Sequence, residues 1–338
     1  MDKAFTSYRM EERSYVSYIK REIHQQVARA KFSETQAGEI DIIVSELSSN
    51  IIKHAGSGEL LFRVGDEDEA SSIFEIISID NGPGIADTMR MLKDGVSTTR
   101  TLGHGLGSIN RLSDLAHLYS MPGWGTILYS VVRTRQGETA RKKGANPDIR
   151  ALCVNKPRET VCGDGYRIKR CGNETFIFFG DGLGHGIKAK EAIDRAGDFF
   201  FECRENEPVE IIRQMHEEIR KTRGLVGTVV KCDTKKQEWQ ICGVGNIFAR
   251  MYTGIEFKNY MPYNGTIGLN LPNSLNASVF RMESNQHLIM STDGIQTRWD
   301  LSKYPSVLKY DNTVLAAAIY KDYKRGNDDA SVLIAKVM

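Results

Sequence analysis

Apolar residues recur at helical spacing through the first fifty residues of the chain. They form one stripe over residues 15–27 and a second over residues 40–51, and positions three and four apart share one face of a helix. Ser33 and Gln36 have the spacing of a capping box, which favours a helix start at that point. The pattern therefore predicts two amphipathic helices, each with one apolar face.

Shorter apolar runs follow and are typical of strands. We predict strands over residues 60–64, 73–79 and 126–132, and a further helix over residues 108–116. Helices and mostly antiparallel strands in this order favour an α/β sandwich. Residues 133–147 are basic, rich in Gly and polar side chains, and lack apolar periodicity, so we expect an exposed linker there.

The remaining residues are richer in strands and form a second predicted domain. Strands are predicted over residues 176–179, 227–232, 238–242, 247–251, 287–291 and 331–337, and helices over residues 188–202 and 208–222. The fold class is α/β (α+β), with both helices and sheets in each domain. We divide the chain into a domain at 1–135, a linker at 136–146 and a domain at 147–338.

Composition narrows the class of protein. The 338 residues are 41% hydrophobic and 26% charged, which is typical of a globular protein. The 45 basic and 43 acidic residues leave a net charge of +2, which gives no electrostatic footprint for nucleic acid. No apolar run approaches the roughly 20 residues that span a bilayer, and no signal peptide is evident. The 6 cysteines contain no CxxC pair, so we expect reduced thiols in a cytoplasmic protein.

Glu46 and Asn50 are the first candidates for chemistry. They lie four residues apart and share one face of the second predicted helix, away from its apolar stripe. An amide oxygen can bind Mg²⁺ beside phosphates, and a carboxylate nearby can orient or deprotonate an attacking hydroxyl. Taken alone, the pair is more typical of a solvated helix face.

Two glycine-rich segments follow this pair. Asp80 ends a predicted strand and precedes Gly82 and Gly84, where a carboxylate can accept a hydrogen bond from an adenine amino group and the glycines allow close approach. Taken alone, this segment could be an ordinary turn. Gly103, Gly105 and Gly107 then precede a helix, an arrangement that can form a phosphate cradle.

The segments ELSSNIIKHA, DNGPGIAD, LKDGVST and GHGLGSINRLSD, followed by Gly125-Thr126, resemble the GHKL (Bergerat-fold) ATPases, and among them the RsbT-type serine kinases. The resemblance covers residues 10–133. It implies that ATP and Mg²⁺ bind here: Asn50 would hold Mg²⁺, Asp80 with Gly82 and Gly84 would bind adenine, Gly103, Gly105 and Gly107 would close over the phosphates, and Thr126 would support the adenine end. Glu46 would be the base for a protein serine hydroxyl.

The second domain carries aspartates at the ends of predicted strands. They are Asp164, Asp181, Asp293 and the pair Asp328 and Asp329. Carboxylates gathered at strand ends repel one another unless a cation holds them together, and hard divalent cations prefer oxygen ligands. Two such ions can activate a bridging hydroxide for attack on phosphorus. Each Asp-Gly pair alone is also typical of an ordinary turn.

The segments FFGDGLGHG, STDGIQ and NDDASVLI resemble the metal-dependent type 2C (PPM) protein phosphatases, in the compact branch typified by SpoIIE and RsbX. This resemblance covers residues 147–338 and implies an αββα sandwich with two Mn²⁺ or Mg²⁺ ions. Asp164, Asp181 and the carbonyl of Gly182 would bind one ion, and Asp181, Asp293 and Asp328 the other. Asp329 would have an outer-shell or structural role. Arg158 and Arg167 are the candidates for binding the substrate phosphate.

The two resemblances together predict a cytoplasmic switch regulator with a serine kinase domain and an opposing phosphatase domain. Its expected partner is a STAS-domain anti-sigma-factor antagonist or a stressosome-like protein, without nucleic acid or membrane, and it could form a homodimer. Two alternatives stay open. One is a phosphatase whose ATP-binding domain only senses nucleotide, and the other is an anti-sigma factor that acts by binding alone.

Overall fold

A computed structural model describes residues 4–66, 71–91, 105–134 and 146–337. The chain forms two compact units. The N-terminal unit comprises Phe5–Arg141 and Ser306–Ala318, and the C-terminal unit comprises Met1–Ala4, Lys142–Pro305 and Ile319–Met338. One cut in the predicted linker does not reproduce this division, because a late segment belongs to the N-terminal unit. Residues 136–145 of that linker lie outside the described residues.

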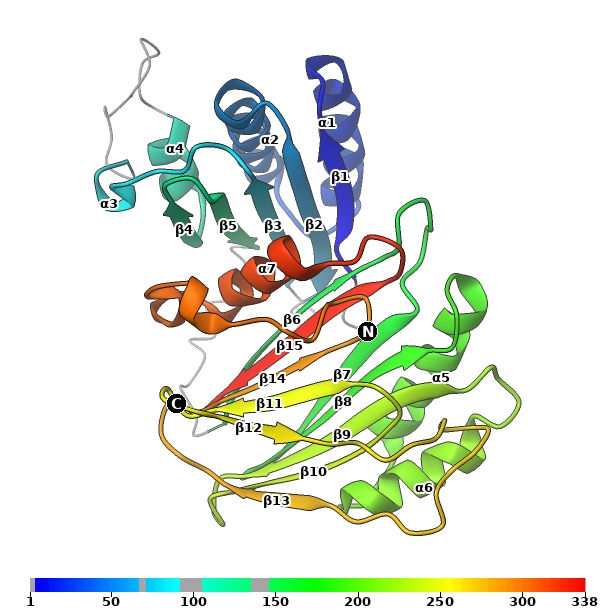
Figure 1. The fold of residues 1–338 in the computed structure, drawn as a ribbon. Helices are drawn as coiled ribbons and strands as arrows, with labels where there is room; N and C mark the ends of the chain where they lie inside the picture. Colours follow the sequence, from blue (N-terminus) through cyan, green and yellow to red (C-terminus); the bar gives the residue numbers. More distant parts are fainter. Residues whose placement is uncertain (1–3, 67–70, 92–104, 135–145, 338) are drawn as a thin grey trace. The chain divides into compact units, whose positions relative to one another are not determined.

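The N-terminal unit is built on one antiparallel five-stranded sheet with the order β1-β2-β3-β5-β4 (Figure 1). The strands are β1 Thr6–Met10, β2 Gly58–Asp66, β3 Ser72–Asp80, β4 Leu115–Met121 and β5 Gly125–Arg133. The helices are α1 Arg13–Ala28, α2 Glu34–Asn50, α3 Thr88–Met91 and α4 Gly105–Leu112, with a π-helical turn, η1, over Ile51–Ala55.

The predicted apolar stripes form the core of this unit. Ile23 of α1 and Ile43 of α2 are completely buried and pack in one cluster with Phe62 and Ile76 of the sheet. Ser33 caps α2 in the predicted capping box with Gln36. Burial of one face of each helix against one face of the sheet confirms the α/β sandwich.

The predicted helix over residues 108–116 is wrong at its C-terminal end. The helix ends at Leu112, and the chain enters β4 at Leu115. Ser113 Oγ donates to the Ile109 carbonyl at 2.6 Å, and the Asp114 N–H donates to Val131 of β5 at 2.8 Å. The apolar residues that follow therefore belong to a strand, and pairing with β5 outweighs their helical spacing.

The C-terminal unit contains two five-stranded sheets, with the orders β13-β10-β9-β8-β7 and β12-β11-β14-β15-β6. The strands are β6 Asp148–Val154, β7 Asp164–Cys171, β8 Glu174–Gly182, β9 Leu225–Asp233, β10 Glu238–Val244, β11 Phe248–Tyr252, β12 Phe257–Tyr260, β13 Ser278–Arg281, β14 His287–Ser291 and β15 Ala330–Lys336. Its helices are α5 Ile187–Glu202 and α6 Pro208–Glu218, with a short 3-10 turn, η2, over Leu301–Lys303. A second 3-10 turn, η3 Val307–Lys309, lies in the late segment of the N-terminal unit, and α7 Asn312–Tyr323 begins in that segment and ends in the C-terminal unit.

Alternation along β8 shows how this unit is layered. Ile177 and Phe179 are buried in the cluster between the two sheets, which includes Leu288 and Leu333 of the second sheet. Phe176 and Phe178 point the other way, into the cluster beneath α5 and α6. Figure 1 shows these two helices together beside the first sheet. The arrangement confirms the predicted α/β (α+β) class, with sheet packed on sheet.

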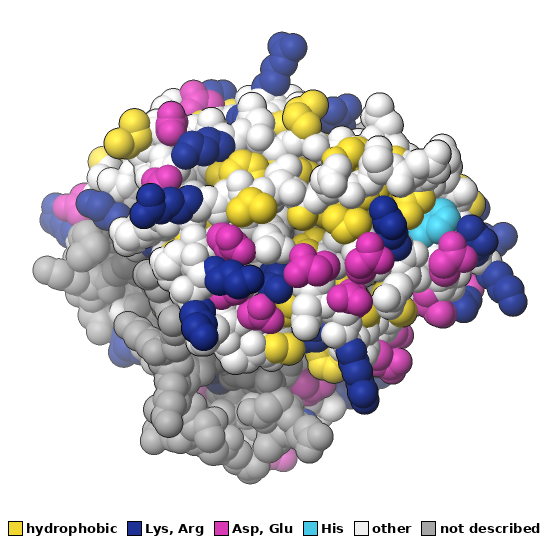
Figure 2. Space-filling view, turned by 90° about the horizontal axis from the view of Figure 1, so that it is seen from below, with side chains coloured by type: hydrophobic (Ala, Val, Ile, Leu, Met, Phe, Trp, Pro, Cys, Tyr) yellow, Lys and Arg dark blue, Asp and Glu magenta, His cyan; other side chains and the backbone are white. Residues whose placement is uncertain are grey.

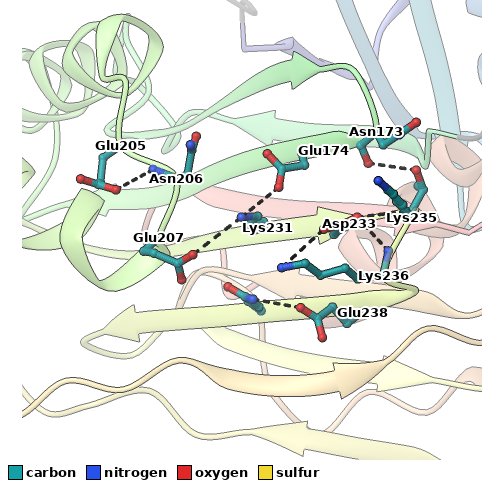
Figure 3. Close-up of polar contacts among 12 residues, drawn as sticks. Asn173, Glu174, Glu205, Asn206, Glu207, Lys231, Asp233, Lys235, Lys236 and Glu238 are labelled. Carbon is teal, nitrogen blue, oxygen red and sulfur yellow. Dashed lines mark hydrogen bonds and ion pairs between the residues drawn. The ribbon is translucent and has the colours of Figure 1, made fainter.

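A buried lysine attaches the helical layer to the first sheet (Figure 3). Lys231 of β9 is only 5% exposed in its side chain, and its Nζ lies 3.0 Å from Glu174 and 3.8 Å from Glu207. Glu174 begins β8, and Glu207 directly precedes α6. The lysine therefore ties two strands to the start of one helix.

The surface shows no dominant charge on the face drawn in Figure 2. Basic and acidic side chains alternate there with apolar ones, in line with the net charge of +2. Within the described ranges, no helix combines the length and apolar character that crossing a membrane requires. The six cysteines all lie in the described part of the chain, and no disulfide joins them there.

Candidate nucleotide and metal sites

Asp80, the predicted adenine ligand, is the last residue of β3. Its Oδ1 accepts hydrogen bonds from the backbone N–H groups of Gly82 at 2.8 Å and Thr126 at 3.2 Å. Asp80 and Thr126 are also register partners in the β3–β5 pair. The carboxylate is therefore held in a fixed orientation at the strand end, beside the threonine predicted to support it.

Glycines let the backbone pack closely around Asp80. Gly84 has a φ of +73°, and a Cβ on it would lie 1.9 Å from the Met121 carbonyl oxygen. Gly125 has a φ of +116°, and a Cβ there would lie 2.1 Å from the Asp80 carbonyl oxygen. Neither position can hold a larger residue without moving the backbone. The turn after β3 is thus pressed against the β4–β5 hairpin.

Glu46 and Asn50 are partly exposed on α2, whereas Ile43 and Leu47 of the same helix are buried. Directly after Asn50 the helix changes to the π-turn η1, a distortion often found at functional sites. Ala55 ends this turn, and a Cβ on Gly82 would lie 2.8 Å from the Ala55 Cβ. One short turn therefore connects the predicted Mg²⁺ ligand to the predicted adenine loop.

The glycine segment leads into α4. Gly105 and Gly107 lie in the first turn of this helix, and Gly103 lies outside the described residues. A Cβ on Gly105 would lie 2.6 Å from Glu46 Oε2. The start of α4, with its positive dipole end, therefore approaches the carboxylate that was predicted to act on a hydroxyl.

The predicted metal ligands come from two pairs of neighbouring strands. Asp164 begins β7 and stands directly opposite Asp181 of β8. Asp293 follows β14 and Asp328 precedes β15, and these two strands pair in the second sheet. Thr292 Oγ1 donates to Asp164 Oδ2 at 2.8 Å and so connects the two pairs across the sheets.

These carboxylates are crowded and poorly solvated. Burial raises the pKa of the Asp164 carboxyl well above its usual value, and the charge of Asp329 raises it further. Burial also raises the pKa of Asp181, and the neighbouring charges of Asp164, Asp293 and Asp328 add to the effect. Asp164 Oδ1 is buried and has no hydrogen-bond partner. Divalent cations would offset this repulsion, so the all-oxygen donor set fits them.

The carboxylates lie near one another, but their oxygens do not point to a common position. In the part of the chain that the structure describes, no three Asp, Glu, His or Cys side chains point to one position that could hold a metal ion. Asp164 Oδ2 is bound to Thr292, and Asp293 Oδ2 accepts a hydrogen bond from Asn246 at 3.0 Å. Binding of an ion therefore requires these side chains to rotate so that their oxygens meet.

Gly182 and Asp329 shape the backbone beside this cluster. A Cβ on Gly182 would lie 2.3 Å from the Ala189 carbonyl oxygen, so α5 packs directly on the end of β8. Asp329 accepts hydrogen bonds from the N–H groups of Lys156 at 2.7 Å and Gly163 at 2.9 Å. It therefore anchors the loop that precedes Asp164, which is a structural role.

The two arginine candidates differ in their surroundings. Arg167 is buried; it donates to the Tyr166 carbonyl and pairs with Asp198 at 3.4 Å. Its guanidinium packs against Gly197, so Arg167 supports the fold and is not placed to bind substrate. Arg158 is exposed, with a left-handed φ of 75°, in the loop that Asp329 anchors.

Sequence reasoning did not identify three polar residues beside the cluster. They are Asn246, Thr292 and Glu159, and Glu159 Oε1 lies 2.7 Å from Nδ1 of His185. Thr292 directly precedes Asp293, so its position offered a signal. Asn246 lies 47 positions from Asp293, and only the folded chain brings the two together. Glu159 is close to Asp164 in the sequence, but its partner His185 lies 26 positions away.

Comparisons with known proteins agree with this architecture. The model of the histidine kinase-like ATPase domain matches residues 11–129. The serine/threonine-protein kinase RsbT of Bacillus subtilis (strain 168) is 36% identical over 101 residues, which cover 30% of this chain and 74% of RsbT. The phosphoserine phosphatase RsbX of the same organism is 24% identical over 165 residues, which cover 48% of this chain and 82% of RsbX.

Solved structures resemble just over half of the chain. One, from work on the bacterial stressosome as a modular system that controls secondary messenger signalling, has a TM-score of 0.53 and 26% identity, and covers 56% of this chain and 98% of its own. RsbX in complex with magnesium has a TM-score of 0.52 and 18% identity, and covers 58% and 98%, so this likeness concerns the fold alone. Through its N-terminal unit the chain belongs to the RsbT family of histidine kinase-like ATPase domains, fused here to a phosphatase domain of the PPM type.

Proposed function

We propose that the chain is a bifunctional switch regulator in partner-switching signalling, in the cytoplasm. Its N-terminal unit would phosphorylate a serine of a STAS-domain anti-sigma-factor antagonist or a stressosome-like protein. Its C-terminal unit would remove phosphate from serine or threonine of the same or a related partner. The observation that carries the phosphatase half is the cross-strand pair of the buried Asp164 and the partly buried Asp181, which lies beside Asp293 and Asp328.

The phosphatase mechanism rests on these carboxylates. Bound Mn²⁺ or Mg²⁺ would supply Lewis-acid chemistry and a nucleophilic water. Asp164, Asp181 and the Gly182 carbonyl would hold one ion, and Asp181, Asp293 and Asp328 the other. Thr292 keeps Asp164 oriented, and Asp329 fixes the loop beside it. No side chain of the protein needs to form a covalent intermediate.

The phosphatase test is hydrolysis of a phosphoserine peptide with Mn²⁺. Asp181→Asn should abolish turnover, because it removes the carboxylate shared by both ions. Asp198→Asn is the matched control, since Asp198 is 73% exposed in its side chain and lies on α5. Equal activity of wild type and Asp181→Asn would contradict the phosphatase assignment.

The kinase half rests on Glu46 and its approach to Gly105. Asp80 would accept a hydrogen bond from the adenine amino group, and Asn50 would hold Mg²⁺. The backbone at Gly103, Gly105 and Gly107 would bind the phosphates, and Thr126 would support Asp80. Glu46 would orient the serine hydroxyl and take its proton during transfer.

The kinase test uses the whole chain, ATP, Mg²⁺ and a STAS-domain protein, with phosphoserine measured by mass spectrometry. Glu46→Gln should abolish transfer and leave ATP affinity within about threefold of wild type, whereas Asp80→Asn should weaken ATP binding. Glu34→Ala, exposed in the first turn of α2, is the control. ATP binding without any phosphoserine in the wild type would instead favour a nucleotide-sensing domain.

A further inference from the structure

Asn246 lies where the chain crosses from one sheet of the C-terminal unit to the other. β10 ends at Val244 in the first sheet, and β11 begins at Phe248 in the second. The crossing is therefore only three residues long, and Asn246 is its exposed middle residue. A side chain here can reach groups that belong to both sheets.

Gly245 holds this crossing against the strand beside Asp181. Its φ is +104°, and a Cβ on it would lie 2.2 Å from Val226 Cγ1. Val226 of β9 is the register partner of Asp181. Because no side chain fits at Gly245, the backbone approaches β9 directly at the position next to the candidate metal ligand.

Hydrogen bonds on the other side fix the same turn. The Gly245 N–H donates to the Tyr263 carbonyl at 2.8 Å, and the Tyr263 N–H donates to the Gly243 carbonyl at 2.9 Å. Gly243 also accepts no larger side chain, because a Cβ there would lie 2.4 Å from Thr228 Oγ1. Asn246 therefore extends from a backbone that is held on both faces.

The amide of Asn246 meets one of the candidate metal ligands. Its Nδ2 donates to Asp293 Oδ2 at 3.0 Å. This bond engages one carboxylate oxygen and leaves Asp293 Oδ1 for a metal ion. A neutral amide suits this place, because lysine would compete with the ion and a further carboxylate would add to the repulsion among the aspartates.

We propose that Asn246 is a positioning residue that orients Asp293 for a divalent cation. The inference rests on the proposed phosphatase function and adds to it a residue from outside the acidic motifs. Partners that orient a metal ligand commonly change metal affinity by ten- to a hundredfold when they are removed. Asn246 does not touch the substrate in this arrangement, so its removal acts through the metal.

The experiment is titration of the whole chain with Mn²⁺ in a calorimeter, followed by phosphopeptide hydrolysis at rising Mn²⁺. Asn246→Ala should weaken Mn²⁺ binding by about tenfold or more. Turnover should return towards the wild-type value at saturating Mn²⁺, with KM for the phosphopeptide unchanged. Asn246→Gln, which keeps the amide, should recover part of the affinity.

Two controls separate orientation from general damage. Asn259→Ala, at an exposed position of β12, should leave Mn²⁺ affinity unchanged. The thermal midpoint in EDTA should be the same for wild type and Asn246→Ala, because the asparagine is exposed. In an Asp293→Asn background, Asn246→Ala should cause no further loss of Mn²⁺ affinity.

The possible failures are distinguishable. If Asp293→Asn weakens Mn²⁺ binding but Asn246→Ala does not, the positioning role is wrong and the proposed function stands. A raised KM with unchanged Mn²⁺ affinity would make Asn246 a substrate contact and also overturn the inference. If the wild type neither binds Mn²⁺ nor hydrolyses the phosphopeptide, the proposed phosphatase function fails, and the inference fails with it.

Discussion

Gly245 occupies a position that only glycine can fill, and a second glycine offers a direct comparison. Gly254 also has a left-handed φ, of +96°, but a Cβ there would meet nothing within 4 Å. Gly254→Ala should therefore cost only the backbone strain, about 1 kcal/mol. Gly245→Ala adds the overlap with Val226, so we expect an unfolding free energy at least about 2 kcal/mol lower than for Gly254→Ala. Urea unfolding in EDTA measures both. Equal losses would show that the turn moves freely away from β9.

His287 of β14 gives the C-terminal unit a dependence on pH. Its side chain is buried, and burial, together with the charge of Lys336, lowers the pKa of the imidazole to about 4. The pKa in the unfolded chain is about 6.5, so the unfolded state binds the proton more readily. The stabilising contribution of neutral His287 is complete above pH 6.5 and is lost as the pH falls towards 4, by up to about 3 kcal/mol.

The measurement is the urea midpoint of wild type and His287→Leu between pH 7.5 and 4.5. The variant should lose less stability over this interval, because leucine binds no proton. His54→Gln, at an exposed position, should follow the wild-type curve. Parallel curves for wild type and His287→Leu would contradict the lowered pKa.

For single residues, the sequence predicts a functional role best where the role depends on residues adjacent in the chain. Asp164, Asp181, Asp293 and Asp328 are recognisable because each lies beside a glycine or at the end of an apolar run. Asn246 cannot be recognised in this way, because its role depends on a hydrogen bond to Asp293, which lies 47 positions away. Arg167 is a similar case, because its burial against Gly197 of α5 cannot be seen in the local sequence.

Among the elements, β9 and α6 depend on the buried Lys231. Its Nζ lies over the Phe176 ring, 5.6 Å from the centroid, besides pairing with Glu174 and Glu207. Lys231→Ala removes both the packing and the charge and should lower the unfolding free energy by about 2 kcal/mol. Lys231→Met retains the packing and should lose about half as much.

Chemical denaturation of these variants tests the contribution of Lys231. Lys235→Ala, in the exposed turn after β9, is the control and should change little. Because Glu174 and Glu207 are partly exposed, the losses should shrink in high salt. A Lys231→Ala variant as stable as the control would mean that the lysine only fills space.

The elements that the sequence predicts best are those with one buried face and a clear period. The stripe on α2 and the apolar runs of β8 and β14 are confirmed for this reason. The edge strands β1 and β13 were not predicted. Each has four or five residues. The side chains of β1 are mostly half-buried and those of β13 are mostly exposed, so neither strand carries a distinct apolar pattern.

On the scale of the whole molecule, the N-terminal unit includes a segment that is distant in sequence. The Asp311 N–H donates to His117 Nδ1 at 2.9 Å. Tyr310 lies edge-on to the rings of His117 at 5.6 Å and Tyr119 at 5.5 Å. His117 and Tyr119 belong to β4, so Ser306–Ala318 helps to cover that strand.

Tyr310→Ala in the whole chain should therefore lower the stability of the N-terminal unit by about 1–2 kcal/mol. The variant would lose two aromatic contacts on β4 while the nucleotide residues stay in place. Hydrogen exchange of the β4 and β5 amides measures the effect locally. Tyr252→Ala, on β11 of the other unit, is the control and should leave those amides unchanged. Unchanged exchange in Tyr310→Ala would show that the segment adds no stability to β4.

The inclusion of Ser306–Ala318 also has a consequence for synthesis on the ribosome. Domains commonly fold in the order in which they are made, the first before the second. Here the first unit lacks its last segment until residue 318 has been translated. By that point every strand of the other unit except β15 has also been made. We expect that the sheet of the N-terminal unit can form early while β4 remains partly uncovered, and that the two units reach their final form almost together. Under the proposed function, the two activities would then appear at nearly the same moment of synthesis.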